Sequence, residues 1–519
     1  MLPRKESSAC GVGFIASLNQ TYSHEHLRRG LDALRCVEHR GACAADQITG
    51  DGAGVMTDIP FDMLGYEKDT IAVATLFVPS NYEERRRALD IFEETFDFLG
   101  LQILEYRDVP VNPDVLGKEA YANLPHIMQA IIQRPHFCRT IESFDKLLFQ
   151  AKQKVRLKHK ENGINRQFFF VSLSAKTIVY KGMMMSNALD QFYLDLNNPE
   201  FKTRFCLFHR RFSTNTSSTW DKAQPFRLIA HNGEINTIAG NRSWAVSREK
   251  SLGFQRDELL THQEISDSGS MNEMIEALRY LSGMPHVEDD LAMLIPPADQ
   301  DNEFYKFWSR AMEPWDGPAF VTYSEGQTIG ARLDRNGFRP CRWATTDDHF
   351  FLSSEAGTFQ LDESEINEKG TLHAGNGVVV HLDTGQVLFR DPSHSIEHYN
   401  AHFDTRLTPI KRTQDSTELR KNERSHEHHM ARLQLFKYSQ EDLKNMLYPM
   451  MSEGKEPIGS MGDTARLAVL SNEDRSFFDF FFQNFSQVTN PPLDFIREEM
   501  VTDLSVYLGK RPNIFEPKE

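Results

Sequence analysis

The chain has 519 residues, of which 40% are hydrophobic and 25% charged, a composition typical of a soluble globular protein with room for several domains. Its net charge of −16 repels phosphate backbones and anionic lipid, so we expect neither nucleic acid nor a membrane as a partner. No apolar run approaches the roughly 18 residues that a membrane helix needs. The expected compartment is the cytoplasm.

Six cysteines, at positions 10, 36, 43, 138, 206 and 341, are too sparse for a disulfide framework and show no metal-binding spacing, which indicates a reducing compartment. The histidine cluster at 425–429 misses the HExxH zinc motif because Met430 stands where the second histidine would be. We therefore expect no metal site in this chain.

The first apolar run, Cys10–Ala16, is typical of a buried strand with a cysteine at its head. A free cysteine in such a place is usually a small hydrophobic residue. The alternative is a nucleophile that becomes active once the polar leader Met1–Ala9 is removed. The new α-amino group of Cys10, with an ordinary pKa of about 8, could then act as its base.

The first half of the chain alternates helical and strand patterns. Leucines at helical spacing predict a helix over 24–39, and a glycine-rich loop at 50–54 leads into a strand at 55–59. A strand at 71–78 is followed by an amphipathic helix at 82–99. Further strands at 167–174 and 177–180, joined through Ser174-Ala175-Lys176, predict a hairpin.

The second half continues with two groups of strands separated by helices. Strands at 204–209 and 227–231 flank the polar segment 210–224, which we expect to be a loop at the edge of a sheet. Helices are predicted at 234–250 and 269–281, and later strands at 319–323, 328–333, 350–353 and 377–382. This order favours sheets packed face to face and covered by helices.

The C-terminal part differs in composition. Residues 406–429 are charged and polar, as in a linker, and residues 430–519 have mainly helical patterns. Six phenylalanines lie between Phe477 and Phe485, more aromatic surface than one helix face can bury. This tail is therefore predicted to belong to a larger module or to form an interface.

Several polar groups have the chemistry that amide hydrolysis by a thiol requires. Arg211, followed by the hydroxyl-rich segment 212–216, could bind a carboxylate with its guanidinium fork. Asn232 and Gly233 offer two neutral donors of the kind found in an oxyanion hole. Asp267 offers a carboxylate that suits a substrate ammonium group. Each pattern is ordinary alone, but their combination with Cys10 favours the nucleophile.

Six motifs resemble, in order, the N-terminal amidotransferase domain of the glutamate synthase large subunit: Cys10–Ala16, Glu38–Cys43, Thr49–Gly54, Arg211–Thr216, Ala230–Thr237 and Asp334–Pro340. Two segments of the tail, Gly459–Asp463 and Gln487–Pro492, resemble the start of that enzyme's central domain. The resemblance implies an α/β fold of the N-terminal-nucleophile hydrolase type, a four-layer αββα sandwich, followed by a mainly helical partial domain.

The resemblance also implies the role of each site residue. The nucleophile would be Cys10, with its freed amine as base, and the oxyanion hole would consist of the Asn232 side chain and the Gly233 N–H. Glutamine's α-carboxylate would be held by Arg211 and Thr214, and its α-amino group by Asp267. Hydrolysis of L-glutamine through a γ-glutamyl thioester would give glutamate, and ammonia for making glutamate from 2-oxoglutarate.

The implied organisation is a cleaved leader (1–9), a class II amidotransferase domain (10–405), a charged linker (406–429) and the start of a central-type domain (430–519). The ammonia acceptor would be synthase domains in cis or a subunit in trans. The FMN and iron–sulfur cluster of the family would belong to later domains, so no cofactor is expected in this chain.

Two other hypotheses remain at this stage. The chain could be a non-catalytic docking fragment or subunit of a synthase assembly, binding a partner through its phenylalanine-rich tail. It could also be an amidotransferase of purine or amino-sugar synthesis, which the tail disfavours because no phosphoribosyl or sugar-phosphate domain is evident.

Overall fold

The computed structural model describes residues 10–164, 168–211, 218–249, 265–281, 286–298, 303–391, 426–436, 438–440, 442–455 and 468–470, together with positions 472, 474 and 477. The chain divides into two units, one of residues 1–406 with 490–519 and one of residues 407–489. Most of the predicted linker (406–429) and most of the predicted helical tail (430–519) lie outside the described residues.

A seven-stranded antiparallel sheet carries the N-terminal strand at its centre. Strand β1 (Gly11–Ser17) lies between β8 (Phe205–Arg210) and β13 (His349–Ser353), and all seven of its residues are buried. The sheet order is β14-β12-β13-β1-β8-β2-β7, with the other strands being β2 (Ala53–Asp58), β7 (Thr177–Gly182), β12 (Arg342–Thr345) and β14 (Glu368–Thr371). The predicted strand headed by Cys10 is therefore confirmed.

A five-stranded sheet packs against it. Its order is β16-β15-β11-β10-β9, with the strands β16 (Val387–Arg390), β15 (Gly377–His381), β11 (Thr328–Leu333), β10 (Ala319–Ser324) and β9 (Ile229–Gly233). Alternate residues face opposite sides. Ala230 and Phe320 belong to the same core cluster as β1, whereas Ile229 and Val321 belong to a cluster with the covering helices. Strand β9 forms one edge.

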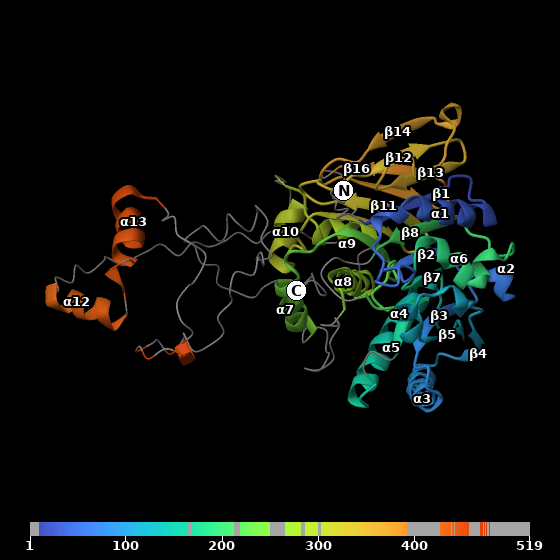
Figure 1. Ribbon diagram of the computed structural model, residues 1–519, viewed down its shortest axis with the longest axis horizontal. Helices are drawn as coiled ribbons and strands as arrows, with labels where there is room; N and C mark the ends of the chain where they lie inside the picture. The colour runs from blue at the N-terminus through green and yellow to red at the C-terminus, as the bar shows by residue number, and fades with distance from the viewer. Residues whose placement is uncertain are drawn as a thin grey trace. The chain divides into compact units, whose positions relative to one another are not determined.

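Helices cover the outer faces of both sheets (Figure 1). Helix α1 (His24–Cys36) packs on β1, β2 and β8, where Gly30 permits close approach because a Cβ there would lie 2.3 Å from the Cys206 Sγ. Helices α8 (Asp267–Leu281) and α9 (Val287–Leu294) contact β9 and β11. The layers run helix, sheet, sheet, helix, so the predicted four-layer αββα sandwich is confirmed.

A third sheet, which the sequence patterns did not predict, extends this unit. Its order is β4-β5-β3-β6, with the strands β4 (Ile103–Asp108), β5 (His126–Gln133), β3 (Ile71–Val78) and β6 (Phe169–Ser174). Helices α3 (Tyr82–Phe98) and α5 (Ile141–Glu161) enclose a separate core with it. The predicted hairpin is wrong: β6 pairs with β3 and β7 pairs with β2, because the connection at 175–176 carries the chain from one sheet into another.

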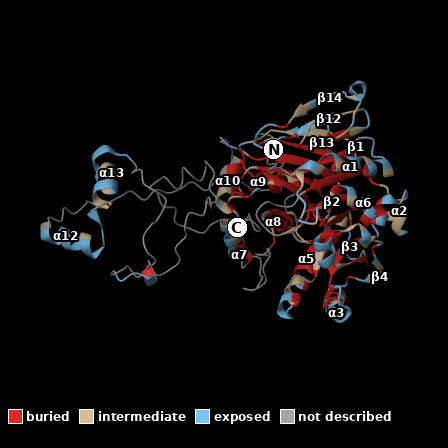
Figure 2. Cartoon of the chain, viewed as in Figure 1, coloured by how far each residue is buried: buried red, intermediate tan, exposed pale blue. Residues whose placement is uncertain are grey.

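The remaining described α-helices are α2 (Phe61–Leu64), α4 (Lys118–Ala122), α6 (Leu189–Phe192), α7 (Ile238–Glu249), α10 (Glu303–Ala311), α12 (His426–Leu435) and α13 (Tyr448–Glu453). Helix α7 starts later than predicted because 234–237 form a turn after β9. In the second unit α12 and α13 are exposed, whereas burial in the first unit concentrates in the sheets (Figure 2). Within the described residues, no helix has the length and apolar character needed to cross a membrane.

Candidate active site

Cys10 is joined to Asn232 by two hydrogen bonds. The Cys10 N–H donates to the Asn232 Oδ1 at 3.1 Å, and the Asn232 Nδ2 donates to the Cys10 carbonyl at 3.0 Å. Asn232 is fully buried and Cys10 is half-buried. The pair thus connects the start of β1 in one sheet to the end of β9 in the other. One hydrogen of the Asn232 amide remains for a further acceptor.

Gly233 ends β9 in a conformation that needs glycine. Its φ is +149°, and a Cβ there would lie 1.8 Å from the Pro318 carbonyl oxygen. The Glu234 N–H bonds the Pro318 carbonyl on β10's side, and residues on an antiparallel strand alternate in the direction of their backbone groups. The Gly233 N–H therefore points away from β10, out of the free edge of the sheet.

Asp267 begins α8 and is fixed by backbone donors. Its Oδ2 accepts from the Ile235 N–H at 3.0 Å, and its Oδ1 accepts from the Ser268 N–H at 2.7 Å. The first bond ties the carboxylate to the turn that follows Gly233. The carboxylate is also close enough to Cys10 to raise the pKa of its thiol.

Arg211 follows β8 with a φ of +89°. Its neighbour Arg210 is buried and donates to the Asp51 Oδ1 at 2.5 Å and to the Glu38 Oε1 at 2.8 Å. The Asp51 Oδ2 lies 3.6 Å from the Arg211 Nε. Two of the motifs thus supply carboxylates that neutralise Arg210. Gly41 is needed beside it, because a Cβ there would lie 1.9 Å from the Arg210 Cζ.

The thiol of Cys10 is protonated at neutral pH in this environment. Its pKa is raised to about 12, chiefly by burial; Asp51 and Asp267 contribute to the rise, while the guanidinium groups of Arg211 and Arg339 oppose it. A thiol with this pKa needs a base beside it before it can act as a nucleophile.

Of the predicted site residues, Cys10, Asn232, Gly233, Arg211 and Asp267 lie at one end of the two packed sheets. Thr214 and the leader 1–9 lie outside the described residues. The roles given to these residues stay predictions. The sequence patterns did not predict the parts played by Arg210, Glu38, Asp51 and Arg339, although all four lie in or beside the motifs of the resemblance.

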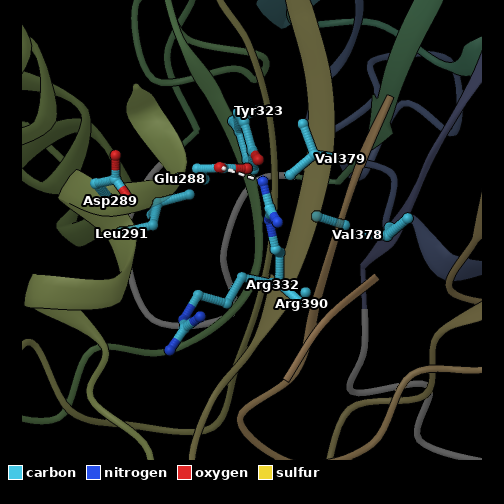
Figure 3. A pocket seen from close by; sticks show the side chains of 10 residues that line it. Glu288, Asp289, Leu291, Tyr323, Arg332, Val378, Val379 and Arg390 are labelled. Atoms are coloured by element: carbon cyan, nitrogen blue, oxygen red, sulfur yellow. Dashed lines mark hydrogen bonds and ion pairs between the residues drawn. The ribbon is translucent and has the colours of Figure 1, made fainter. Parts of the chain in front are cut away.

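A second group of buried charges lies on α9, outside the predicted site (Figure 3). It lines a small cavity of about 20 Å³ between α9 and the five-stranded sheet. Glu288 pairs with Arg390 at 3.2 Å, and the Arg332 guanidinium donates to the Ile295 carbonyl. Burial raises the pKa of Asp289 to about 8. Figure 3 shows Glu288 reaching across toward Arg390.

Comparison with known proteins agrees with the motifs. Residues 10–402 match the family "Glutamine amidotransferases class-II", and residues 431–519 match "Glutamate synthase central domain". The chain belongs to the class-II glutamine amidotransferases. The resemblance seen in the sequence is thereby confirmed, and so is the assignment as an enzyme.

Relatives of this class-II glutamine amidotransferase are long synthases. It is 39% identical to ferredoxin-dependent glutamate synthase 2 of Synechocystis sp., over 99% of this chain and 34% of that protein. It is 38% identical to the chloroplastic ferredoxin-dependent glutamate synthase 2 of Arabidopsis thaliana (98% and 33%), and 36% identical to the ferredoxin-dependent glutamate synthase of Pyropia yezoensis (99% and 35%). The chain spans about one third of the length of these relatives.

Proposed function

We propose that this chain hydrolyses L-glutamine to glutamate and ammonia, with Cys10 as the nucleophile. The observation that carries the proposal is the position of the Cys10 nitrogen, held by Asn232 beside the outward Gly233 N–H. After removal of 1–9, an amine at this position would still donate to the Asn232 Oδ1 and would keep its lone pair. The amine and the thiol of one cysteine are separated only by its own Cα and Cβ, so proton transfer between them is local.

In the proposed reaction the amine takes the thiol proton, and the thiolate sulfur forms a bond to the γ-carbonyl carbon. The resulting oxyanion would accept hydrogen bonds from the Asn232 Nδ2 and the Gly233 N–H. The C–N bond then breaks as the ammonium group returns its proton to the leaving nitrogen, which departs as ammonia. Attack of water on the thioester releases glutamate and restores the thiol.

The charges around Cys10 fit the two ends of a free amino acid. Arg211, with Thr214, would bind the α-carboxylate, and Asp267 would bind the α-ammonium group. The Asp267 carboxylate already accepts two backbone N–H groups, which fixes its orientation, and retains lone pairs for a third donor. Carboxylate and ammonium recognition together select an α-amino acid amide.

Two measurements on one preparation test this proposal. N-terminal sequencing of the active protein should begin at Cys10, and Cys10→Ala should lower glutamate release by at least about 1,000-fold with no change in the melting temperature. Cys36→Ala, which removes an exposed thiol, is the control and should retain full activity. An active protein that retains Met1 would refute the mechanism. An inactive wild type, with Cys10 unmodified by a glutamine-mimicking thiol reagent, would favour the docking alternative.

We further propose that the ammonia serves glutamate synthesis from 2-oxoglutarate, in synthase domains of the same polypeptide or in a partner subunit. The central-domain match at 431–519 and the synthase relatives support this. Hydrolysis at Cys10 uses only a thiol, an amine and hydrogen-bond donors, so the FMN and iron–sulfur cluster implied by the resemblance would serve the later reductive step. Six unpaired thiols favour a reducing compartment, which we propose is the cytoplasm.

A further inference from the structure

Three buried polar side chains connect the Asp267 carboxylate to β9, the strand that carries the proposed oxyanion donors. The His231 Nδ1 lies 2.8 Å from the Ser268 Oγ, which lies 3.3 Å from the Asp267 Oδ1. On the other side, the Gln224 Oε1 accepts the His231 N–H at 2.7 Å, and the Gln224 Nε2 donates to the His231 carbonyl at 3.2 Å. His231, Gln224 and Ser268 are each at most 4% exposed.

The donors in this network follow from its chemistry. Ser268 donates its hydroxyl hydrogen to the Asp267 carboxylate, so its oxygen accepts from the His231 Nδ1–H. This requires a proton on the Nδ1, and because burial lowers the pKa of His231, the ring is the neutral imidazole with its hydrogen on Nδ1. The Gln224 Nε2 also lies 3.4 Å from the Ser268 Oγ. The Ser268 hydroxyl therefore contacts three separate parts of the chain: His231 on β9, the Gln224 side chain, and Asp267 at the start of α8.

We propose that Ser268, with His231 and Gln224, is a positioning residue that sets the ammonium-binding carboxylate of Asp267 at a fixed distance from the oxyanion donors. The inference rests on the proposed function of Asp267. Glutamine must place its α-ammonium group and its γ-carbonyl at the same time, and the two receiving groups lie on different elements, α8 and β9. His231 precedes Asn232 in the chain, so a bond from its side chain to Ser268 links the two elements directly.

Direct binding of L-glutamate and of glutarate to the processed protein tests this role, because glutarate has the same carbon chain without the ammonium group. Ser268→Ala should weaken glutamate binding about 10-fold, the effect of losing a hydrogen bond to a charged group, and leave glutarate binding unchanged. It should raise the KM for glutamine by a similar factor with a smaller change in kcat. Ser268→Thr keeps the hydroxyl and should restore both values.

The matched control is Ser270→Ala, which removes another fully buried hydroxyl from α8, one that accepts from Arg242 and does not touch the network. It should leave both Kd values unchanged. His231→Asn, which keeps an N–H donor near the Nδ1 position, should bind glutamate more tightly than His231→Leu. Equal weakening of glutamate and glutarate, or an unchanged KM in Ser268→Ala, would overturn the inference. Ser268-dependent glutamate binding without any hydrolysis would refute the proposed function instead.

Discussion

The end of the two sheets that carries Cys10 and the cavity beside α9 both bury charge, but they compensate it differently. Beside Cys10, Arg210 meets carboxylates from two separate loops, and Asp267 accepts two backbone N–H groups. On α9, the Asp289 Oδ2 and both carboxylate oxygens of Asp290 have no hydrogen-bond partner among the described residues. In the first region, ion pairs and hydrogen bonds hold Arg210 and Asp267 in fixed orientations. In the second region, the carboxyl groups of Asp289 and Asp290 are more stable when protonated.

Among the substitutions that test this difference between the two regions, Arg210→Met is expected to have the largest effect. It leaves Glu38 and Asp51 without their shared cation, and an uncompensated buried charge costs about 3–5 kcal/mol of the free energy of unfolding. Asp51, already 3.6 Å from the Arg211 Nε, would then compete with substrate for Arg211 and raise the KM for glutamine. Urea unfolding and glutamine kinetics measure the two effects.

The control for Arg210→Met is Arg28→Gln. Arg28 is 58% exposed and pairs with Glu25 at 2.6 Å, so its loss should change the free energy of unfolding by less than about 0.5 kcal/mol. Similar losses in the two variants would contradict the view that Arg210 is a structural cation of the site.

The next effect is expected from Gly233→Ala. The added Cβ cannot keep both the φ of +149° and its place beside the Pro318 carbonyl, so the N–H of residue 233 must move. Loss of one oxyanion donor lowers kcat by about 100- to 1,000-fold. The assay is glutamate release at saturating glutamine. Gly65→Ala is matched, since Gly65 has a φ of +77° with open space around it, and it should keep full kcat.

The smallest effect, and opposite in sign, is expected from Asp289→Asn. The folded protein holds the pKa of Asp289 at about 8 against an ordinary value of 3.8, so it binds this proton more tightly than the unfolded chain does. The contribution of Asp289 to the free energy of unfolding of the wild type is therefore greatest below about pH 4, and it is lost as the pH rises toward 8. Because asparagine does not titrate, the variant should be more stable than the wild type at pH 7 to 8.

Unfolding measured from pH 4.5 to 8.5 checks this prediction. The stability difference between Asp289→Asn and the wild type should grow with pH across that range. The exposed residue Asp114, changed to asparagine, should show no such trend. A difference that shrinks as the pH rises would show that Asp289 is stabilised as a carboxylate by the arginines nearby.

Structure that depends only on residues adjacent in the chain could be predicted from the sequence. The apolar run after Cys10 forms β1, and the turn residues Asn232 and Gly233 end a strand, as their types favour. The separation of β6 from β7 was not predictable, because Ser174-Ala175-Lys176 is compatible with a hairpin and with a change of sheet. The difference depends on which partners β2 and β3 offer, and both strands lie far earlier in the chain, at Ala53–Asp58 and Ile71–Val78.

The candidate site divides in the same way. Cys10, Arg211 and Asp267 were predicted because their chemistry matches a substrate group. Arg210, Ser268 and Gln224 act on other protein groups, and nothing in their neighbours distinguishes them from ordinary surface or cap residues. Strand β4 was missed for a related reason: its residues are exposed or only half-buried, so it has no apolar run to indicate a strand.

Strand β9 is the last strand of the five-stranded sheet. A free sheet edge invites strand addition by another chain, which leads to self-association. Here the Gln224 side chain bonds both backbone groups of His231, as a neighbouring strand would, and the Phe226 N–H bonds the Ile229 carbonyl. Among the described residues, Gln224 thus occupies the backbone groups of β9 that an incoming strand would pair with, while the N–H of Gly233, two residues farther along the same edge, stays directed outward.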